Sequence, residues 1–134
     1  MDGGKDVCER VVLQRMRNRV IEAVQLLAEG DAGVRSVGAN EWVNQFFDVV
    51  DDDSPWEWRS WPVWTAEEVR YVGAVHDALL DVCRRTPHVL NDDVFIAAGW
   101  PSRIVGAAQA AESALLARGR FSEEVEEAEP GHSA

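Results

Sequence analysis

Acid–base chemistry in this sequence centres on His76, which is followed directly by Asp77, with Asp81 one helical turn further on. A histidine beside a carboxylate can act as a general base, because the carboxylate orients the imidazole and stabilises its protonated form. The competing interpretation is a histidine at the edge of an apolar helix face that makes one hydrogen bond. We favour this second interpretation, because no nucleophile lies at an informative spacing from His76.

Three consecutive acids, Asp51, Asp52 and Asp53, invite a cation. The calcium-loop template does not fit them. With Asp51 in its first position, Trp56 stands where a glycine is needed and Pro62 where a bidentate glutamate is needed. The simpler interpretation is a solvated helix end and loop.

A second acidic cluster combines His88 with Asp92 and Asp93 around a predicted turn. These residues could be metal ligands, but the start of the next helix explains both aspartates. The chain also contains no H-x-x-x-H, C-x-x-C, G-x-S-x-G, G-x-x-x-x-G-K or G-x-G-x-x-G motif. We therefore predict no catalytic residues, no metal and no cofactor.

Residues 56–64 hold four of the six tryptophans. Pro62 and the preceding Pro55 predict an extended segment, and a polyproline II repeat would place Trp58, Trp61 and Trp64 on one side. The rings could form a recognition surface or a strap that buries indoles against the helices. We favour the strap for most rings and expect Trp56 and Trp58 to be the exposed pair.

Partner binding is predicted where this segment adjoins the acids. The candidate partner-binding residues are Asp51, Asp52, Asp53, Trp56, Glu57, Trp58 and Arg59, with His76 and Asp77 as secondary functional candidates.

Helical periodicity and capping signals predict the elements that must position these side chains. The clearest signal is Thr65-Ala66-Glu67-Glu68, a capping box in which Glu68 can reach back to the Thr65 amide. A glycine-punctuated loop is expected over 31–38. The predicted helices cover residues 6–29, 40–50, 65–85, 91–98 and 101–118.

These elements predict an all-α fold, an irregular bundle of four to five helices with an extended Trp/Pro-rich linker and a flexible acidic C-terminal tail. Residues 1–5 are expected to be a flexible N-terminus, 6–118 a single helical domain and 119–134 a disordered acidic tail. The two cysteines, Cys8 and Cys83, are expected at opposite ends of the bundle, both reduced.

Charge narrows the choice of partner. The chain of 134 residues has a formal net charge of −11, which disfavours nucleic acid and anionic membranes and favours a basic protein. No stretch has the apolar length of a membrane helix and the start is not a secretory signal, so we expect a cytoplasmic protein. The arginines of residues 10–19 are interpreted as a balance for the acids of residues 41–57.

Four stretches, 17–28, 46–53, 67–81 and 100–111, resemble a family of small, uncharacterised helical bacterial proteins found mainly in actinobacteria. The resemblance covers roughly residues 10–118 and rests on patterns of helix faces. It implies a helical fold and no established activity.

The leading functional hypothesis is a non-catalytic protein-binding domain, immunity-like or regulatory, that offers an acidic and aromatic face to a basic partner. One alternative is a small-ligand-binding protein or enzyme that uses His76 and nearby carboxylates. Another is a structural subunit that self-associates as a homo-oligomer through the tryptophan segment.

Overall fold

The computed structural model describes residues 9–50, 57–86 and 91–128, and every regular element within these ranges is helical. The described elements are α1 (Glu9–Ala28), α2 (Asp31–Val37), α3 (Ala39–Val49), the 3-10 helix η2 (Glu57–Ser60), α4 (Ala66–Arg85), α5 (Asp92–Ala97) and α6 (Trp100–Arg118). The predicted all-α bundle is therefore confirmed for this part of the chain.

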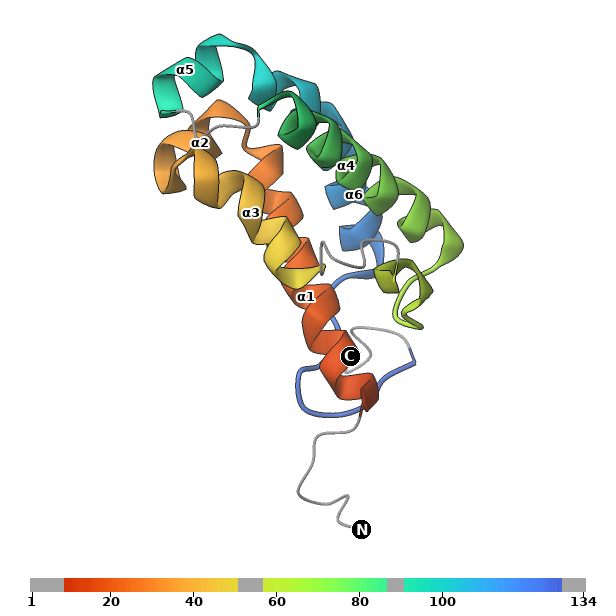
Figure 1. Cartoon of the computed structure of the whole chain (residues 1–134). Coiled ribbons are helices and arrows are strands. Elements are labelled where there is room, and N and C mark those ends of the chain that lie inside the picture. Colours follow the sequence, from red (N-terminus) through yellow and green to blue (C-terminus); the bar gives the residue numbers. More distant parts are fainter. Residues whose placement is uncertain (1–8, 51–56, 87–90, 129–134) are drawn as a thin grey trace.

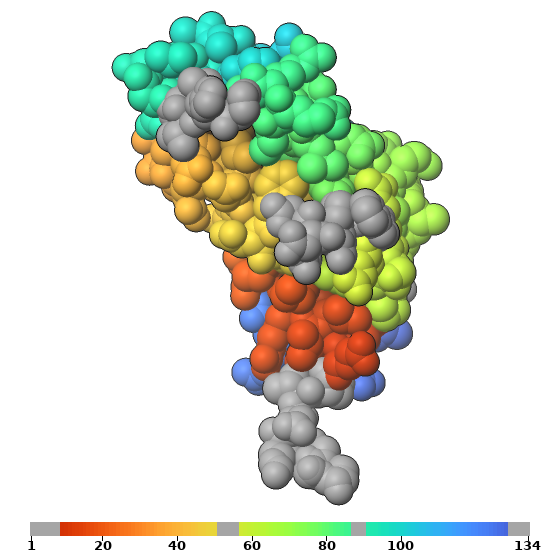
Figure 2. All heavy atoms as spheres, viewed as in Figure 1, coloured from red at the N-terminus to blue at the C-terminus, as the bar shows by residue number. Residues whose placement is uncertain are grey.

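Helix α6 joins the two sides of the bundle, with α1 on one side of it and α4 on the other (Figure 1). Helix α1 packs against α6 and α3, and α6 packs in turn against α4. The short helices α2 and α5 contact each other and close the end of the bundle at which α1 finishes. Figure 2 shows that the described part narrows toward the start of α1, where atoms of the C-terminal segment appear on both sides of this helix.

One apolar core joins these helices. Its largest fully buried apolar side chains come from every long helix and from η2, and each large aliphatic or aromatic side chain buried there contributes about 1.5–3 kcal/mol. They are Ile21 and Leu27 of α1, Trp42 and Phe46 of α3, Trp58 of η2, Leu79 of α4, and Ile104 and Leu115 of α6. The core therefore fixes how the helices sit, and with them the side chains discussed below.

The five predicted helices are observed, and the ends that fall within the described residues agree to within one turn; the predicted start of the first helix, residue 6, lies outside them. The capping box at the start of α4 is formed: the Glu68 amide donates to Thr65 Oγ1 at 3.0 Å, and the Thr65 amide donates to Glu68 Oε1 at 2.9 Å. Asn91 caps α5 in the same way, because its side chain accepts from the Val94 amide at 2.8 Å.

The loop predicted over residues 31–38 is wrong, because residues 31–37 form α2. Gly30 turns the chain out of α1 with a φ of 61°. Gly33, one of the glycines that favoured a loop, is needed for packing, since a Cβ there would lie 2.6 Å from the Leu26 carbonyl oxygen and 2.8 Å from Trp42 Nε1. The Trp42 indole N–H donates to that same carbonyl at 3.0 Å. The glycine therefore permits helices to approach closely and does not mark a loop.

The extended tryptophan segment is also wrong for residues 57–60, which form the 3-10 helix η2. This turn directs Trp58 inward, where it is 1% exposed. Trp64 donates its indole N–H to the Trp58 carbonyl at 3.0 Å, and the Trp61 and Trp64 rings stack with centroids 6.2 Å apart. The tight turn lets rings of different depth pack on one another, which a polyproline II segment does not do.

A disordered tail is expected over residues 119–134, and the structure differs for the part that it describes. Residues 119–128 lie against the N-terminal half of α1, and Phe121 is 3% exposed. The segment is rich in glutamate, which predicts disorder from composition, but its main-chain groups bond to side chains of α1. The first five residues, and residues 129–134, lie outside the described part of the chain.

Candidate functional site

Two groups of predicted site residues, 57–59 and 76–77, meet between η2 and α4. The Trp58 indole N–H donates to His76 Nδ1 at 3.1 Å, and the two rings pack edge to face with centroids 5.8 Å apart. The hydrogen bond forms because η2 turns Trp58 toward the face of α4 that carries His76.

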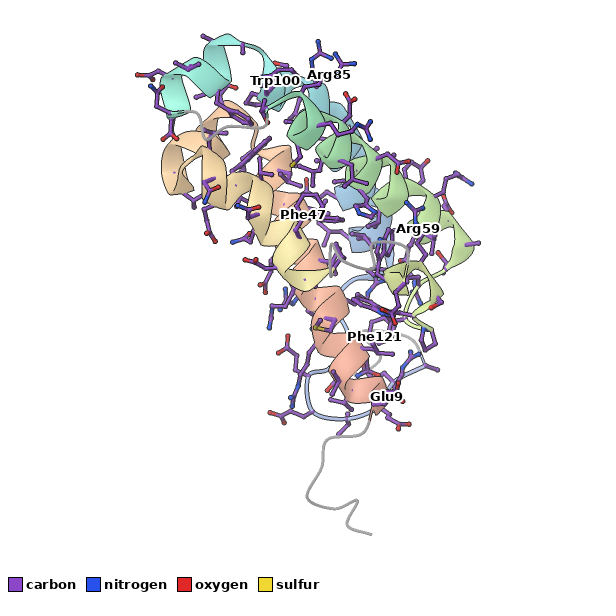
Figure 3. All side chains as sticks on the ribbon, viewed as in Figure 1. Glu9, Phe47, Arg59, Arg85, Trp100 and Phe121 are labelled. Carbon is purple, nitrogen blue, oxygen red and sulfur yellow. The ribbon has the colours of Figure 1, made fainter. Side chains whose placement is uncertain are left out.

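Aromatic rings of α3 complete the surroundings of His76. The Phe46 centroid lies 5.7 Å and the Phe47 centroid 6.0 Å from the imidazole centroid. His76 is 2% exposed, so it lies inside the core and not at the edge of the apolar face of its helix, although it makes the one expected hydrogen bond. We name Phe46, Phe47, Trp58 and His76 the aromatic cluster. Figure 3 shows Phe47 directed from α3 toward α4.

The environment of His76 favours a neutral imidazole. Burial lowers the pKa of His76, and the positive charge of Arg59 lowers it further, while Asp77 acts in the opposite direction. Since Nδ1 accepts the Trp58 hydrogen bond, the neutral ring carries its proton on Nε2. Nε2 is buried and has no hydrogen-bond partner within the described ranges. Neither nitrogen is therefore presented to solvent as a general base.

Asp77 does not orient His76 in the predicted way. Its carboxylate faces Arg59, with Arg59 Nη2 3.6 Å from Asp77 Oδ1. The Arg59 guanidinium also packs on the Trp58 ring, 4.9 Å from its centroid. It lies so close to α4 that a Cβ on Gly73 would be 2.5 Å from Arg59 Nη1. Arg59, which Figure 3 labels beside α4, thus covers the Trp58 ring of the cluster.

The other predicted partner-binding residues differ in their exposure to solvent, and some lie outside the described part of the chain. The prediction that Trp58 is exposed is wrong, because η2 buries it in the core. Glu57 is exposed beside it, as is Asp48 near the end of α3. The candidates Asp51, Asp52, Asp53 and Trp56 lie outside the described residues.

The acids predicted as possible metal ligands at the start of α5 have structural partners. Asp92 accepts from the Ala39 amide at 2.8 Å and so joins α5 to the start of α3. Asp93 lies 3.4 Å from Arg35 Nη1, and His88 lies outside the described residues. Across residues 9–50, 57–86 and 91–128, no group of three or more His, Cys, Asp and Glu side chains could hold a metal ion.

A buried ion cluster is the feature that sequence reasoning missed. Arg17 Nη1 lies 2.9 Å from Glu68 Oε1, and Arg118 Nη2 lies 2.7 Å from the same oxygen. The side chains of Arg17 and Glu68 are 0% and 3% exposed. Burial raises the pKa of Glu68, but hydrogen bonds from Arg118 and Arg17 outweigh burial and lower it, so the carboxylate stays ionised.

A signal for this cluster exists in the sequence. Arg17 occupies the same helical stripe as Val20, Ile21 and Val24, so periodicity alone places it on the buried face of α1. The partner across the core cannot be found this way, since Glu68 is 51 residues distant along the chain. The interpretation of the α1 arginines as a balance for residues 41–57 is corrected accordingly: Arg17 pairs with α4, and Arg19 pairs with Glu22 and Glu123.

Comparison with protein-family models, with curated proteins and with solved structures finds no match for this chain. The resemblance to a family of helical bacterial proteins therefore stays a prediction. None of the described helices is both long and apolar enough to cross a membrane.

Proposed function

We propose that the chain is a non-catalytic protein-binding domain, immunity-like or regulatory, that presents an acidic face on a rigid aromatic support to a basic partner. We name this surface the η2 face and define it by Phe47, Asp48, Glu57, Arg59 and Asp77. The observation that supports the proposal is the meeting of η2, α3 and α4 around the aromatic cluster, which holds Arg59 beside the exposed carboxylate of Asp77.

Rigidity supports this proposal because a preformed surface loses little conformational entropy on binding. Two neighbours fix Trp58. Its indole N–H donates to His76 Nδ1 at 3.1 Å, and the Arg59 guanidinium carbon lies 4.9 Å from its ring centroid. The charged groups are solvent-accessible: the Asp77 side chain is 75% exposed, and Asp48 and Glu57 are exposed too. They are held on a scaffold that does not have to fold on contact.

Charge supports a basic partner. The net charge of −11 steers a cationic protein toward the chain and repels polyanions. On the η2 face three acids outnumber one arginine, and that arginine already pairs with Asp77. A cationic surface, such as the active-site rim of a nucleic-acid enzyme or a basic toxin, has the matching chemistry.

The test is affinity capture from the native cytosol at low salt with three immobilised proteins. These are the wild type, the site variant Asp48→Lys/Glu57→Lys, and the control Glu29→Lys/Asp31→Lys, which makes the same charge change at two exposed positions, one just after α1 and one at the start of α2. We expect one basic protein to be retained by the wild type and the control and lost from the site variant. Recovery of nothing above background, or equal recovery on all three proteins, contradicts the proposal.

A small-ligand-binding protein or enzyme centred on His76 is a second candidate, favoured by the partnerless Nε2–H, which offers a buried donor to an acceptor group. Thermal unfolding with a panel of small carboxylic acids, alcohols and nucleosides tests it. This candidate requires at least one compound to raise the melting temperature of the wild type but not of His76→Ala. Shifts that are the same in both proteins exclude His76 as the centre of a site.

Self-association of the chain into a homo-oligomer is a third candidate. Sedimentation equilibrium at high protein concentration tests it directly, and a monomer throughout the accessible range removes it.

A further inference from the structure

The N-terminal half of α1 holds residues 119–128 by their main chain (Figure 1). Five side chains of α1 reach these main-chain groups. Arg17 donates to the Gly119 carbonyl at 2.9 Å, and we name the other four together the α1 clamp: Arg10, Gln14, Arg15 and Asn18. This arrangement differs from ordinary helix packing, in which apolar side chains interlock.

Asn18 bonds to both main-chain groups of one residue. Its Nδ2 donates to the Phe121 carbonyl at 2.9 Å, and its Oδ1 accepts from the Phe121 amide at 3.0 Å. A neighbouring strand in an antiparallel sheet satisfies a residue in the same reciprocal way. Asn18 is 1% exposed, so the pairing takes place away from water.

Gln14 extends the same recognition further along the segment. Its Nε2 donates to the carbonyls of Ser122 and Val125, both at 2.8 Å, and its Oε1 accepts from the Glu127 amide at 2.8 Å. Both N–H groups and the carbonyl of this fully buried amide are therefore used on a single peptide.

The two clamp arginines also donate to main-chain carbonyl groups. Arg15 donates to the Glu123 carbonyl at 2.8 Å, and Arg10 donates to the Glu127 carbonyl at 2.7 Å. Because these bonds join the clamp side chains to main-chain groups, the clamp would make the same bonds to any peptide with the backbone conformation of residues 119–128.

Two side chains of the segment supply selectivity. Phe121 is 3% exposed and lies beneath the guanidinium groups of Arg10, Arg17 and Arg118, which are 5.2, 5.1 and 5.4 Å from its ring centroid. The Glu123 carboxylate accepts from Asn18 Nδ2 at 2.8 Å and from Arg19 at 2.9 Å. Glu124, Val125 and Glu126 are exposed. Figure 3 shows Phe121 beside the N-terminal part of α1.

We propose that the α1 clamp is a peptide-binding surface that the chain's own C-terminal segment occupies, and that its ligand is an acidic peptide with a phenylalanine two residues before a glutamate, folded into the turn that Ser122 closes by accepting from the Glu124 and Val125 amides. Main-chain bonds supply affinity, and the Phe121 and Glu123 side chains supply selectivity. The acidic ligand suits the arginines of α1, so this surface differs in charge and place from the η2 face.

Displacement is feasible because of how the segment is attached. Phe121 is the one buried side chain among residues 119–128, and most hydrogen bonds between this segment and α1 are only partly buried. Segments with few buried apolar contacts open locally at lower free energy than a core helix. The tethered segment has an effective concentration of about millimolar, so a competing peptide must bind well or the segment must first be released.

Fluorescence anisotropy tests the proposal on the full-length chain. The probe is a labelled synthetic peptide of residues 119–134, and the receptor is a released variant, Phe121→Ala/Glu123→Ala, whose own segment has lost both selective side chains. We expect the released variant to bind the probe at least about tenfold more tightly than the wild type does, because its own segment competes less.

Clamp variants and probe variants sharpen the test. In the released background Asn18→Ala is expected to weaken binding about tenfold, because two hydrogen bonds and the Glu123 contact are lost. Arg15→Ala removes one main-chain bond at a half-buried position and is expected to weaken binding a few-fold with unchanged helix content. A probe with the same composition in scrambled order controls for charge alone.

Three results overturn the proposal: no binding of the probe by a released variant that keeps its helical circular dichroism, binding that Asn18→Ala and Arg15→Ala leave unchanged, or equal binding of the scrambled probe. If Asn18→Ala unfolds the chain, the Arg15→Ala and scrambled-probe comparisons still decide.

Discussion

His76 makes its hydrogen bond as an acceptor, and this limits the pH range over which the bond exists. The Trp58 indole N–H needs the lone pair of Nδ1, and a doubly protonated imidazole has none. Burial and the charge of Arg59 lower the pKa of His76, whereas Asp77 raises it to a smaller extent. A group of this kind stabilises the fold while it is neutral.

We predict that stability falls as the pH is lowered below 6.5, the ordinary pKa of histidine, down to the lowered pKa of His76 in the fold. The unfolded chain binds the proton first, so acid favours unfolding in this window. The slope is at most about 1.4 kcal/mol per pH unit for one proton. Urea denaturation at a series of pH values measures it. His76→Gln keeps an acceptor without titrating, so a slope that persists in this variant contradicts the assignment.

Glu68 combines two roles at one residue, since it caps α4 and neutralises two arginines. We predict that Glu68→Gln lowers the free energy of unfolding by about 3 kcal/mol, because Arg17 is left buried without a countercharge. Asp93→Asn is the control, since its pair with Arg35 joins side chains 87% and 61% exposed and is worth about 0–1 kcal/mol. Equal losses in the free energy of unfolding of the two variants would show that the buried ion cluster contributes no more to stability than the exposed ion pair does.

At the scale of elements, the long helices follow from local signals. The capping box fixes the start of α4, and Gly99 with Pro101 fixes the start of α6. The short elements α2 and η2 do not follow from such signals, because a segment of seven or four residues is too brief to show a period. Their conformation depends on what they pack against.

Substitutions at Gly33 and Gly106 distinguish the effect of close packing on stability from the effect of helix propensity. We predict that Gly33→Ala destabilises the fold by about 1–3 kcal/mol, because its Cβ would lie 2.6 Å from the Leu26 carbonyl oxygen. Gly106 lies in the exposed interior of α6, and a Cβ added there would meet nothing within 4 Å. At Gly106 the same change should stabilise the fold by about 0.5–1 kcal/mol. Thermal denaturation measures both, and a neutral Gly33→Ala would mean that α2 shifts to accept the methyl group.

At the scale of the whole molecule, charges that look separate in sequence cancel across the fold. The acidic C-terminal segment meets the arginines of α1, and Arg19 Nη2 lies 2.9 Å from the Glu123 carboxylate, 104 residues further along the chain. Phe121 ties this segment to the core through one side chain. The described part of the chain therefore has a helical body and one attached segment, residues 119–128, that packs on it.

We predict that the Phe121 amide exchanges its hydrogen faster than the Val24 amide in the middle of α1, although the Phe121 amide is bonded to Asn18 at 3.0 Å. The reason is that residues 119–128 can open without unfolding α1. Native-state hydrogen exchange measured by NMR tests this. Equal protection of the two amides would mean that the segment opens only when the whole chain unfolds.

The amino-acid sequence by itself determined the all-helical class, the places where the long helices begin and end, and the excess of negative charge, because these depend on residues about four apart or on composition. Only the tertiary structure decided that Trp58 is buried on His76, that Arg17 neutralises Glu68 and that residues 119–128 lie on α1. These contacts join groups far apart along the chain. Their partners depend on how whole helices pack, and no local pattern records that.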